Sequence, residues 1–164
     1  MKKDEIQNLI KELVEKTTVK INEISVVEEN PKNIWVSVEV NEPHFFISHE
    51  GEGLHALNHI VHRILESKNP TPGVGAERVP PAGLGIIIDV NGFQKKHVDS
   101  VRAVAHMMSE RARYFKSNIE VDPMSAFERR IVHEFLSDAT DLKTESMGYG
   151  RDRRVVIKYV GNSL

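Results

Sequence analysis

The chain of 164 residues contains no cysteine, and only 6% of its residues are aromatic. The lack of cysteine excludes disulfide bonds, thiolate metal sites and cysteine nucleophiles. No apolar stretch approaches the roughly 20 residues that a membrane-spanning helix needs. The N-terminus leads into an amphipathic pattern rather than into the apolar core of a signal peptide. We therefore expect a soluble, cytoplasmic protein with no membrane span.

The composition is otherwise that of a folded protein, with 40% hydrophobic residues, 28% charged residues and a formal net charge of −2. The charge is unevenly distributed along the chain. Residues 1–91 hold 9 Lys and Arg against 14 Asp and Glu (9 − 14 = −5), whereas residues 92–164 hold 13 against 10 (13 − 10 = +3). A polyanion, if one binds, is therefore expected to prefer the C-terminal part.

Hydrophobic periodicity predicts an α+β fold in two domains, residues 1–91 and residues 92–164. The N-terminal part reads as a helix, a hairpin that turns at Asn30-Pro31-Lys32-Asn33, a second helix and a buried strand that ends at Asn91-Gly92. Residues 67–83 hold four prolines and three glycines without periodicity, so we interpret them as a loop insertion.

The C-terminal part is predicted to hold two helices and at least two strands, the strands over 142–147 and 153–160. The longest helix runs from about Gln94 to Lys116. Asp122-Pro123 is expected to begin the next helix, with a possible capping box between Ser125 and Glu128. The apolar positions expected to be buried in these helices are Val98, Val101, Ala105, Met108, Ala112 and Phe115, then Met124, Phe127, Ile131 and Phe135.

Arg129 and His133 lie four residues apart on this last helix, which places them side by side. They fall roughly opposite the predicted apolar stripe, so both are expected to reach water, with Arg130 at the flank. A guanidinium beside an imidazole suits phosphate, and the imidazole can also stack on a base. A solvated helix face often shows such pairs, so the spacing alone is weak.

Further cations gather near the C-terminus and strengthen that interpretation. Arg153 and Arg154 open the last strand, Lys158 shares a strand face with Arg154, and Tyr149 in the preceding turn offers a ring for stacking. A basic surface with an aromatic residue and without a candidate nucleophile is typical of a protein that binds single-stranded nucleic acid.

Several of these segments together resemble the bacterial Jag family, the SpoIIIJ-associated, KhpB-type RNA-binding proteins. The resemblance covers roughly residues 84–160, and Arg129-x-x-x-His133 is similar to the signature of the family's R-x-x-x-H ("R-three-H") domain. The matching segments are Asp89-Val90-Asn91-Gly92-Phe93, residues 122–133 with Asp122-Pro123-Met124-Ser125, Thr144-Glu145-Ser146, and Arg153-Arg154-Val155-Val156-Ile157.

The resemblance implies that residues 1–91 form a KH domain and that the chain is a non-catalytic binder of single-stranded RNA, or of single-stranded DNA, without a cofactor. It further implies a post-transcriptional regulator linked to cell growth or division, with a small KH-domain protein or a second copy as partner. Longer family members begin with an additional N-terminal domain and a linker, and neither is expected from this sequence.

The sequence departs from the family at the loop with which a KH domain holds RNA. A Gly-x-x-Gly loop is expected there, but the chain reads Ser48-His49-Glu50-Gly51. The first glycine lets backbone N–H groups close on phosphate, and Glu50 adds a like charge. We therefore expect a weakened contact at this loop, with Gly51-Glu52-Gly53 as an alternative loop.

Three other functions stay open. His55, His59 and His62 share a helix face and offer ring nitrogens to a metal ion in a metal-binding protein. Asp89 and Asn91 at a strand end, with His97 nearby, are compatible with an enzyme site for magnesium. The helix over residues 94–116 is long enough to pack against a protein partner in a scaffold.

Overall fold

The computed structural model describes residues 3–30, 33–68 and 85–161, which form two compact units, Met1–Gln94 and Lys95–Leu164. Both units combine helices with a three-stranded sheet, so the predicted α+β class is confirmed. Within the described residues, no helix is both long and apolar enough to cross a membrane.

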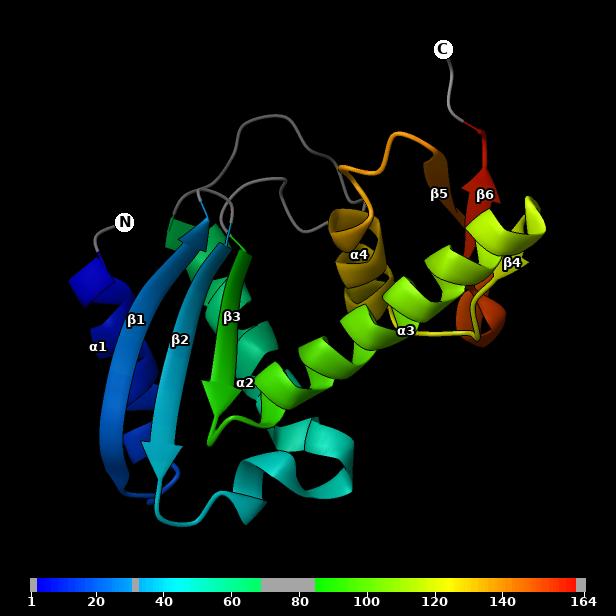
Figure 1. Cartoon of the computed structure of the whole chain (residues 1–164). Coiled ribbons are helices and arrows are strands. Elements are labelled where there is room, and N and C mark those ends of the chain that lie inside the picture. Colours follow the sequence, from blue (N-terminus) through cyan, green and yellow to red (C-terminus); the bar gives the residue numbers. More distant parts are fainter. Residues whose placement is uncertain (1–2, 31–32, 69–84, 162–164) are drawn as a thin grey trace. The chain divides into compact units, whose positions relative to one another are not determined.

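The first unit packs two helices against one face of its sheet (Figure 1). β1 pairs with β2 antiparallel, β2 pairs with β3 parallel, and the strand order is β1-β2-β3. Alternate residues of the central strand, such as Val36 and Val38, are fully buried beneath the helices. The elements are α1 (Lys3–Glu15), β1 (Ile21–Asn30), β2 (Asn33–Val40), α2 (His44–Lys68) and β3 (Gly85–Val90).

Four residues with non-helical backbone, Ser48 to Gly51, interrupt α2. His49, Glu50 and Gly51 have φ angles of 52°, 59° and 83°, whereas Ser48 has a φ of −62° and a ψ of 157°. Ser48 therefore has an extended backbone that any residue adopts. The strain of the left-handed conformation falls on His49 and Glu50 rather than on Ser48, which stands where a Gly-x-x-Gly loop has its first glycine.

The predicted loop over residues 67–83 is largely outside the described residues. Its first two positions, Ser67 and Lys68, belong to the last turn of α2 rather than to a loop. Residues 69–83 lie outside the part of the chain that the structure describes.

The second unit contains an antiparallel sheet with the strand order β4-β6-β5. Its longest helix begins at Phe93, two residues before the unit itself. The two predicted helices and the two predicted strands are present, and the structure adds a short strand between the helices. The elements are α3 (Phe93–Phe115), β4 (Ile119–Glu120), α4 (Ala126–Phe135), β5 (Leu142–Met147), the 3₁₀ helix η1 (Gly150–Asp152) and β6 (Arg154–Tyr159).

The helix α4 begins later than expected, whereas the capping box expected between Ser125 and Glu128 is confirmed. Asp122 and Pro123 precede the helix, and Ser125 is its N-cap. The Ser125 hydroxyl accepts a hydrogen bond from the Glu128 N–H (3.3 Å), and the Glu128 carboxylate accepts one from the Ser125 N–H (2.7 Å). The capping box satisfies two backbone donors at once, so it fixes the helix start more strongly than the Asp-Pro pair does.

Two residues predicted to be buried are exposed. Phe135 and Phe115 are 42% and 59% exposed, respectively. On α4 the buried side chains are Ile131 and Val132, so the helix is rotated relative to the stripe that the phenylalanines suggested. Phe115 is the last residue of α3, where the core under the helix has already ended at Ala112.

Candidate nucleic-acid interface

The predicted pair Arg129 and His133 lies on α4 where this helix packs on β5 and β6. Both side chains are half-buried, which differs from the expectation that both would lie on a solvated face. Arg129 Nη1 donates a hydrogen bond to the carbonyl oxygen of Met124 (2.7 Å). The Met124 N–H in turn donates to the carbonyl oxygen of Arg153 (3.2 Å). Met124 therefore connects the Arg129 guanidinium to the start of β6.

Two hydroxyl groups of β5 hold the ring of His133. Nδ1 lies 2.7 Å from the Thr144 hydroxyl oxygen, and Nε2 lies 2.8 Å from the Ser146 hydroxyl oxygen. Residues 144 and 146 are two apart on a strand, so their side chains point to the same face of the sheet. Neither ring nitrogen is open to a phosphate in this arrangement, so His133 positions α4 on β5.

The environment of His133 favours the neutral imidazole. Burial lowers the pKa of His133 below its ordinary value, and the positive charge of Arg129 lowers it further. A neutral imidazole donates from one ring nitrogen and accepts at the other. A hydroxyl group can donate or accept a hydrogen bond, so Thr144 and Ser146 together satisfy both ring nitrogens of the neutral imidazole.

Arg153 and Arg154 point to opposite faces of the second unit's sheet. Val155 pairs with Ser146, whose hydroxyl contacts His133, so Val155 lies on the face of the sheet that His133 contacts. Because side chains alternate along a strand, Arg153 lies on that same face. Arg154 lies on the other face, where its Nη1 is 3.3 Å from the Glu120 carboxylate. The single cationic surface expected from the sequence is therefore divided by the alternation along β6.

The same alternation places Lys158 with Arg154. The Lys158 ammonium group pairs with Glu145 on the neighbouring strand. The outer face of this sheet thus holds two cations that are each paired with a carboxylate. The cations left for the inner face are Arg129 and Arg153.

Arg153 is only partly satisfied by the protein. Its Nη1 donates to the Gly148 carbonyl at the long distance of 3.4 Å. Its buried Nε is the one buried side-chain nitrogen or oxygen without a hydrogen-bond partner among the residues that the structure describes. A buried donor without a partner costs about 1–3 kcal/mol. This guanidinium is therefore not fixed by an internal carboxylate.

Tyr149 and Arg130 flank this corner of the unit. Tyr149 is 90% exposed in the turn that follows β5, and Gly148 before it has a φ of 88°. A Cβ at Gly148 would lie 3.0 Å from the Asp152 carbonyl oxygen, so glycine suits this tight turn. Arg130 is exposed on α4 and takes part in an interaction of its own.

The other predicted contact, residues 48–51, lies in the first unit. Ser48, His49 and Glu50 are exposed, whereas Gly51 is buried against Phe93. A Cβ at Gly51 would lie 2.7 Å from the Phe93 ring, so both packing and its φ require glycine. Gly53, the end of the alternative loop, has helical backbone, so the interruption of α2 ends at Gly51. A Cβ at Gly53 would lie 2.4 Å from the Phe45 carbonyl oxygen, so glycine is required there for packing.

The three histidines considered for a metal site do not converge. His62 Nε2 is hydrogen-bonded to the Ile86 carbonyl oxygen of β3 (3.0 Å), whereas His55 and His59 are exposed. Over residues 3–30, 33–68 and 85–161, no group of three or more His, Asp or Glu side chains is placed to hold a metal ion. The geometry gives the metal-binding alternative no support.

The residues considered for an enzyme site have contacts within the fold. Asp89 is buried and its Oδ1 accepts the N–H of Gln94 (2.9 Å), which fixes the start of α3. The Asn91 side-chain amide bonds both backbone groups of Val40. His97 Nε2 lies 3.1 Å from Glu128 in the second unit. Each of these three side chains therefore has a contact within its own unit.

The second unit corresponds to a known class of domain. Residues 99–159, which include α4 and the sheet with Arg129, His133 and Arg153, match the R-three-H domain family. This match supports the resemblance drawn from the R-x-x-x-H motif. The assignment of residues 1–91 as a KH domain stays a prediction.

A longer relative is also similar to this chain. The RNA-binding protein KhpB of Bacillus subtilis (strain 168) is 24% identical over 135 residues, which make up 81% of this chain. The aligned region covers 60% of that protein, so the chain corresponds to about three fifths of its relative's length. The alignment supports the Jag-type resemblance beyond the R-three-H domain alone.

Proposed function

We propose that the chain is a non-catalytic RNA-binding protein that holds single-stranded RNA at the corner formed by α4, η1 and the start of β6. The observation that carries this proposal is the placement of Arg129 and Arg153 on one side of the unit, joined through Met124, with neither guanidinium paired to a carboxylate in the contacts given above. The R-three-H match and the RNA-binding relative support it.

Arg129 and Arg153 act as the phosphate contacts. A guanidinium carries five N–H donors in a planar fork, and one bond from Arg129 to a backbone carbonyl leaves others for a phosphate. The net charge of +3 over residues 92–164 attracts the RNA backbone to this unit. Arg130 adds charge at the flank, and Tyr149 supplies a ring for base stacking.

His133 serves this site as a positioning residue. Its ring is held between Thr144 and Ser146 of β5, so it fixes α4 on this strand and, with the helix, the position of Arg129 one turn away. Arg154 contributes less than the motif suggested, because it lies on the opposite face beside Glu120.

The first unit contributes a second, weaker contact in this proposal. In this proposal the backbone N–H groups of residues 48–51 contact phosphate, as those of a KH loop do, but the exposed carboxylate of Glu50 repels it. The excess of acidic residues in this part of the chain acts in the same direction.

The cellular role proposed is post-transcriptional regulation linked to growth or division, in the cytoplasm of a bacterium. A small KH-domain protein or a second copy is the proposed partner, and single-stranded DNA is a competing ligand. This layer rests on the resemblance to the Jag family.

Titration of labelled single-stranded RNA at several salt concentrations tests the proposal. Each neutralised phosphate contributes about −0.7 to the slope of log K against log salt. Arg129→Ala should weaken binding to all RNA sequences and flatten the slope by about one such contact. Arg63→Ala, which removes an exposed arginine from the first unit, is the matched control. Equal effects of the two variants would contradict the proposed site.

A further inference from the structure

The last turn of α3 carries two exposed aromatic rings that the proposed site does not use. Tyr114 and Phe115 are 82% and 59% exposed. Their ring centroids lie 5.0 Å apart with the planes at 90° to one another. Two adjacent exposed rings at one helix end offer an apolar surface on which the flat face of a ligand can pack.

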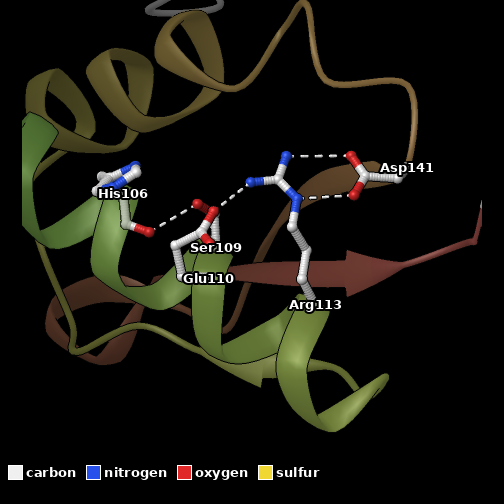
Figure 2. A network of polar contacts seen from close by, with 5 residues as sticks. All are labelled: His106, Ser109, Glu110, Arg113 and Asp141. Carbon is white, nitrogen blue, oxygen red and sulfur yellow. Dashed lines mark hydrogen bonds and ion pairs between the residues drawn. The ribbon is translucent and has the colours of Figure 1, made fainter.

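A network of ion pairs fixes the backbone beneath these rings (Figure 2). Arg113 Nε and Nη2 lie 2.7 Å and 3.1 Å from the two carboxylate oxygens of Asp141, and its Nη1 lies 2.6 Å from Glu110. The guanidinium lowers the pKa of Asp141 below its ordinary value, which keeps this carboxylate charged. The bidentate pair joins the helix end to the segment before β5.

The helix end itself is also well defined. The Ser117 N–H donates to the Ala112 carbonyl oxygen (3.2 Å), and the Lys116 N–H donates to that of Arg113 (3.4 Å). Lys116 has a φ of 48°, so these bonds form a Schellman motif with lysine in the position that glycine usually takes. The backbone that carries the two rings is therefore held in place, and binding a ligand to the rings costs little backbone entropy.

The charges around the rings favour an anionic ligand. Arg111 precedes the aromatic pair in the chain and Lys116 follows it, and both are exposed. The two carboxylates of the network, Glu110 and Asp141, share the single guanidinium of Arg113, so one negative charge remains against the two positive charges of Arg111 and Lys116. Exposed rings interleaved with cations form the kind of surface on which successive bases of a single strand stack.

We propose that Tyr114 and Phe115 form a further contact for single-stranded RNA within the second unit, where bases stack on the rings and Arg111 and Lys116 hold the phosphates. This proposal rests on the proposed function, because it needs the chain to bind RNA. The ring contact goes beyond the proposed function because it adds a base-stacking surface at one end of the second unit's sheet, whereas Arg153 lies at the other end.

The register of the sheet determines how far apart the two contacts lie. Arg154 pairs with Met147 at one end of β5, and Tyr159 pairs with Leu142 next to Asp141 at the other. Five steps along a strand span about 17 Å at about 3.4 Å each. A short RNA that fills the Arg129 corner should therefore not reach the rings, whereas a longer RNA should reach both.

The test measures the affinity of uridine oligonucleotides of about 4 and about 16 nucleotides, the range of site sizes of single-strand binders. The double variant Tyr114→Ala, Phe115→Ala should weaken binding of the long RNA about tenfold or more and leave the short RNA unchanged. The variant Tyr114→Trp should retain the affinity, and its indole fluorescence should be quenched by the long RNA only. Phe45→Ala, at an exposed ring of the first unit, is the control.

Several outcomes would overturn the proposal. An unchanged affinity for the long RNA means that the rings do not stack on bases, and an equal loss for both lengths means that they act through the Arg129 corner. A wild-type dimer that the double variant converts to a monomer in light scattering assigns the rings to a second copy. If the wild type binds neither RNA, the proposed function fails. If Arg129→Ala weakens binding of the long RNA and the ring variant does not, only the stacking contact is contradicted, and the proposed function is retained.

Discussion

At the scale of single residues, the imidazole of His133 decides how the R-x-x-x-H pair works. Its two nitrogens are occupied by hydroxyl groups, and the neighbouring guanidinium of Arg129 opposes a positive charge on the ring. A neutral, doubly hydrogen-bonded histidine adds no charge to a phosphate site at neutral pH. It adds rigidity, because α4 and β5 are held together where the arginine must be placed.

This arrangement predicts a pH dependence of stability. His133 has a pKa below about 6.5 in the folded protein and near that value when unfolded, so the unfolded state binds the proton first. Its contribution to stability is complete above about pH 6.5 and is lost as the pH falls through the lowered, folded pKa. The wild type should therefore lose more unfolding free energy than His133→Gln between about pH 7.5 and about pH 5.5.

Urea unfolding at the two pH values provides the measurement. The other seven histidines are present in both proteins, so their contributions cancel in the difference. A difference between wild type and variant that does not change with pH would mean that His133 titrates in the same way in both states.

The sequence predicted the adjacency of Arg129 and His133 but not their contacts. Four-residue spacing on a helix is sufficient to place the two side chains together. The partners of His133 lie on β5, eleven and thirteen residues further along the chain, and no local pattern links a histidine to distant hydroxyl groups. The alternation of Thr144 and Ser146 was the available signal, since it gives two hydroxyls on one strand face.

At the scale of elements, the turn of residues 48–51 shows where the backbone cost of an altered Gly-x-x-Gly loop falls. Ser48 is extended, so a glycine there relieves nothing, whereas Glu50 has a φ of 59°. A residue other than glycine in the left-handed region costs about 1–2 kcal/mol. Glycine in turn costs about 0.4–1 kcal/mol through the greater freedom of the unfolded chain.

These magnitudes predict opposite effects at two positions of the same turn. Glu50→Gly should stabilise the protein by about 0.5–1 kcal/mol, the relief of strain less the entropy of the unfolded chain. Ser48→Gly should destabilise it by about 0.4–1 kcal/mol, because only the entropy changes. Thermal or urea unfolding of both variants tests this, and stabilisation by Ser48→Gly would contradict the backbone geometry described for the turn.

Elements were predictable where periodicity was strong and less so where two apolar patterns compete. On α4, the spacing of Phe127, Ile131 and Phe135 suggested one buried stripe, but Ile131 and Val132 are the buried residues and Phe135 is exposed. Both stripes satisfy a helical period, and only the sheet to which the helix docks selects between them. The start of α4 was ambiguous for the same reason, since the competing Asp122 and Ser125 are both good caps.

At the scale of the whole molecule, the face that a cation occupies matters more than the number of cations. The sequence grouped Arg129, Arg153 and Arg154 because they are close in the chain or share a motif. The register of β5 and β6 separates Arg153 from Arg154 by placing them on opposite faces of one sheet. The net charge of residues 92–164 cannot distinguish the two faces, because it does not say to which face each side chain points.

Two neighbouring substitutions therefore test which face binds RNA. Arg153→Ala and Arg154→Ala each remove one positive charge, and screening over about 8–10 Å makes their long-range effects on the RNA nearly equal. Arg153 lies on the face of the sheet that His133 contacts, and its guanidinium is not paired with a carboxylate in the contacts described above. Arg154 Nη1 lies 3.3 Å from the Glu120 carboxylate on the other face. Arg153→Ala should weaken binding and flatten the salt slope by about 0.7, and Arg154→Ala should change both much less. If Arg154→Ala has the larger effect, RNA lies on the outer face of the sheet, and the corner of α4, η1 and β6 is not the binding site.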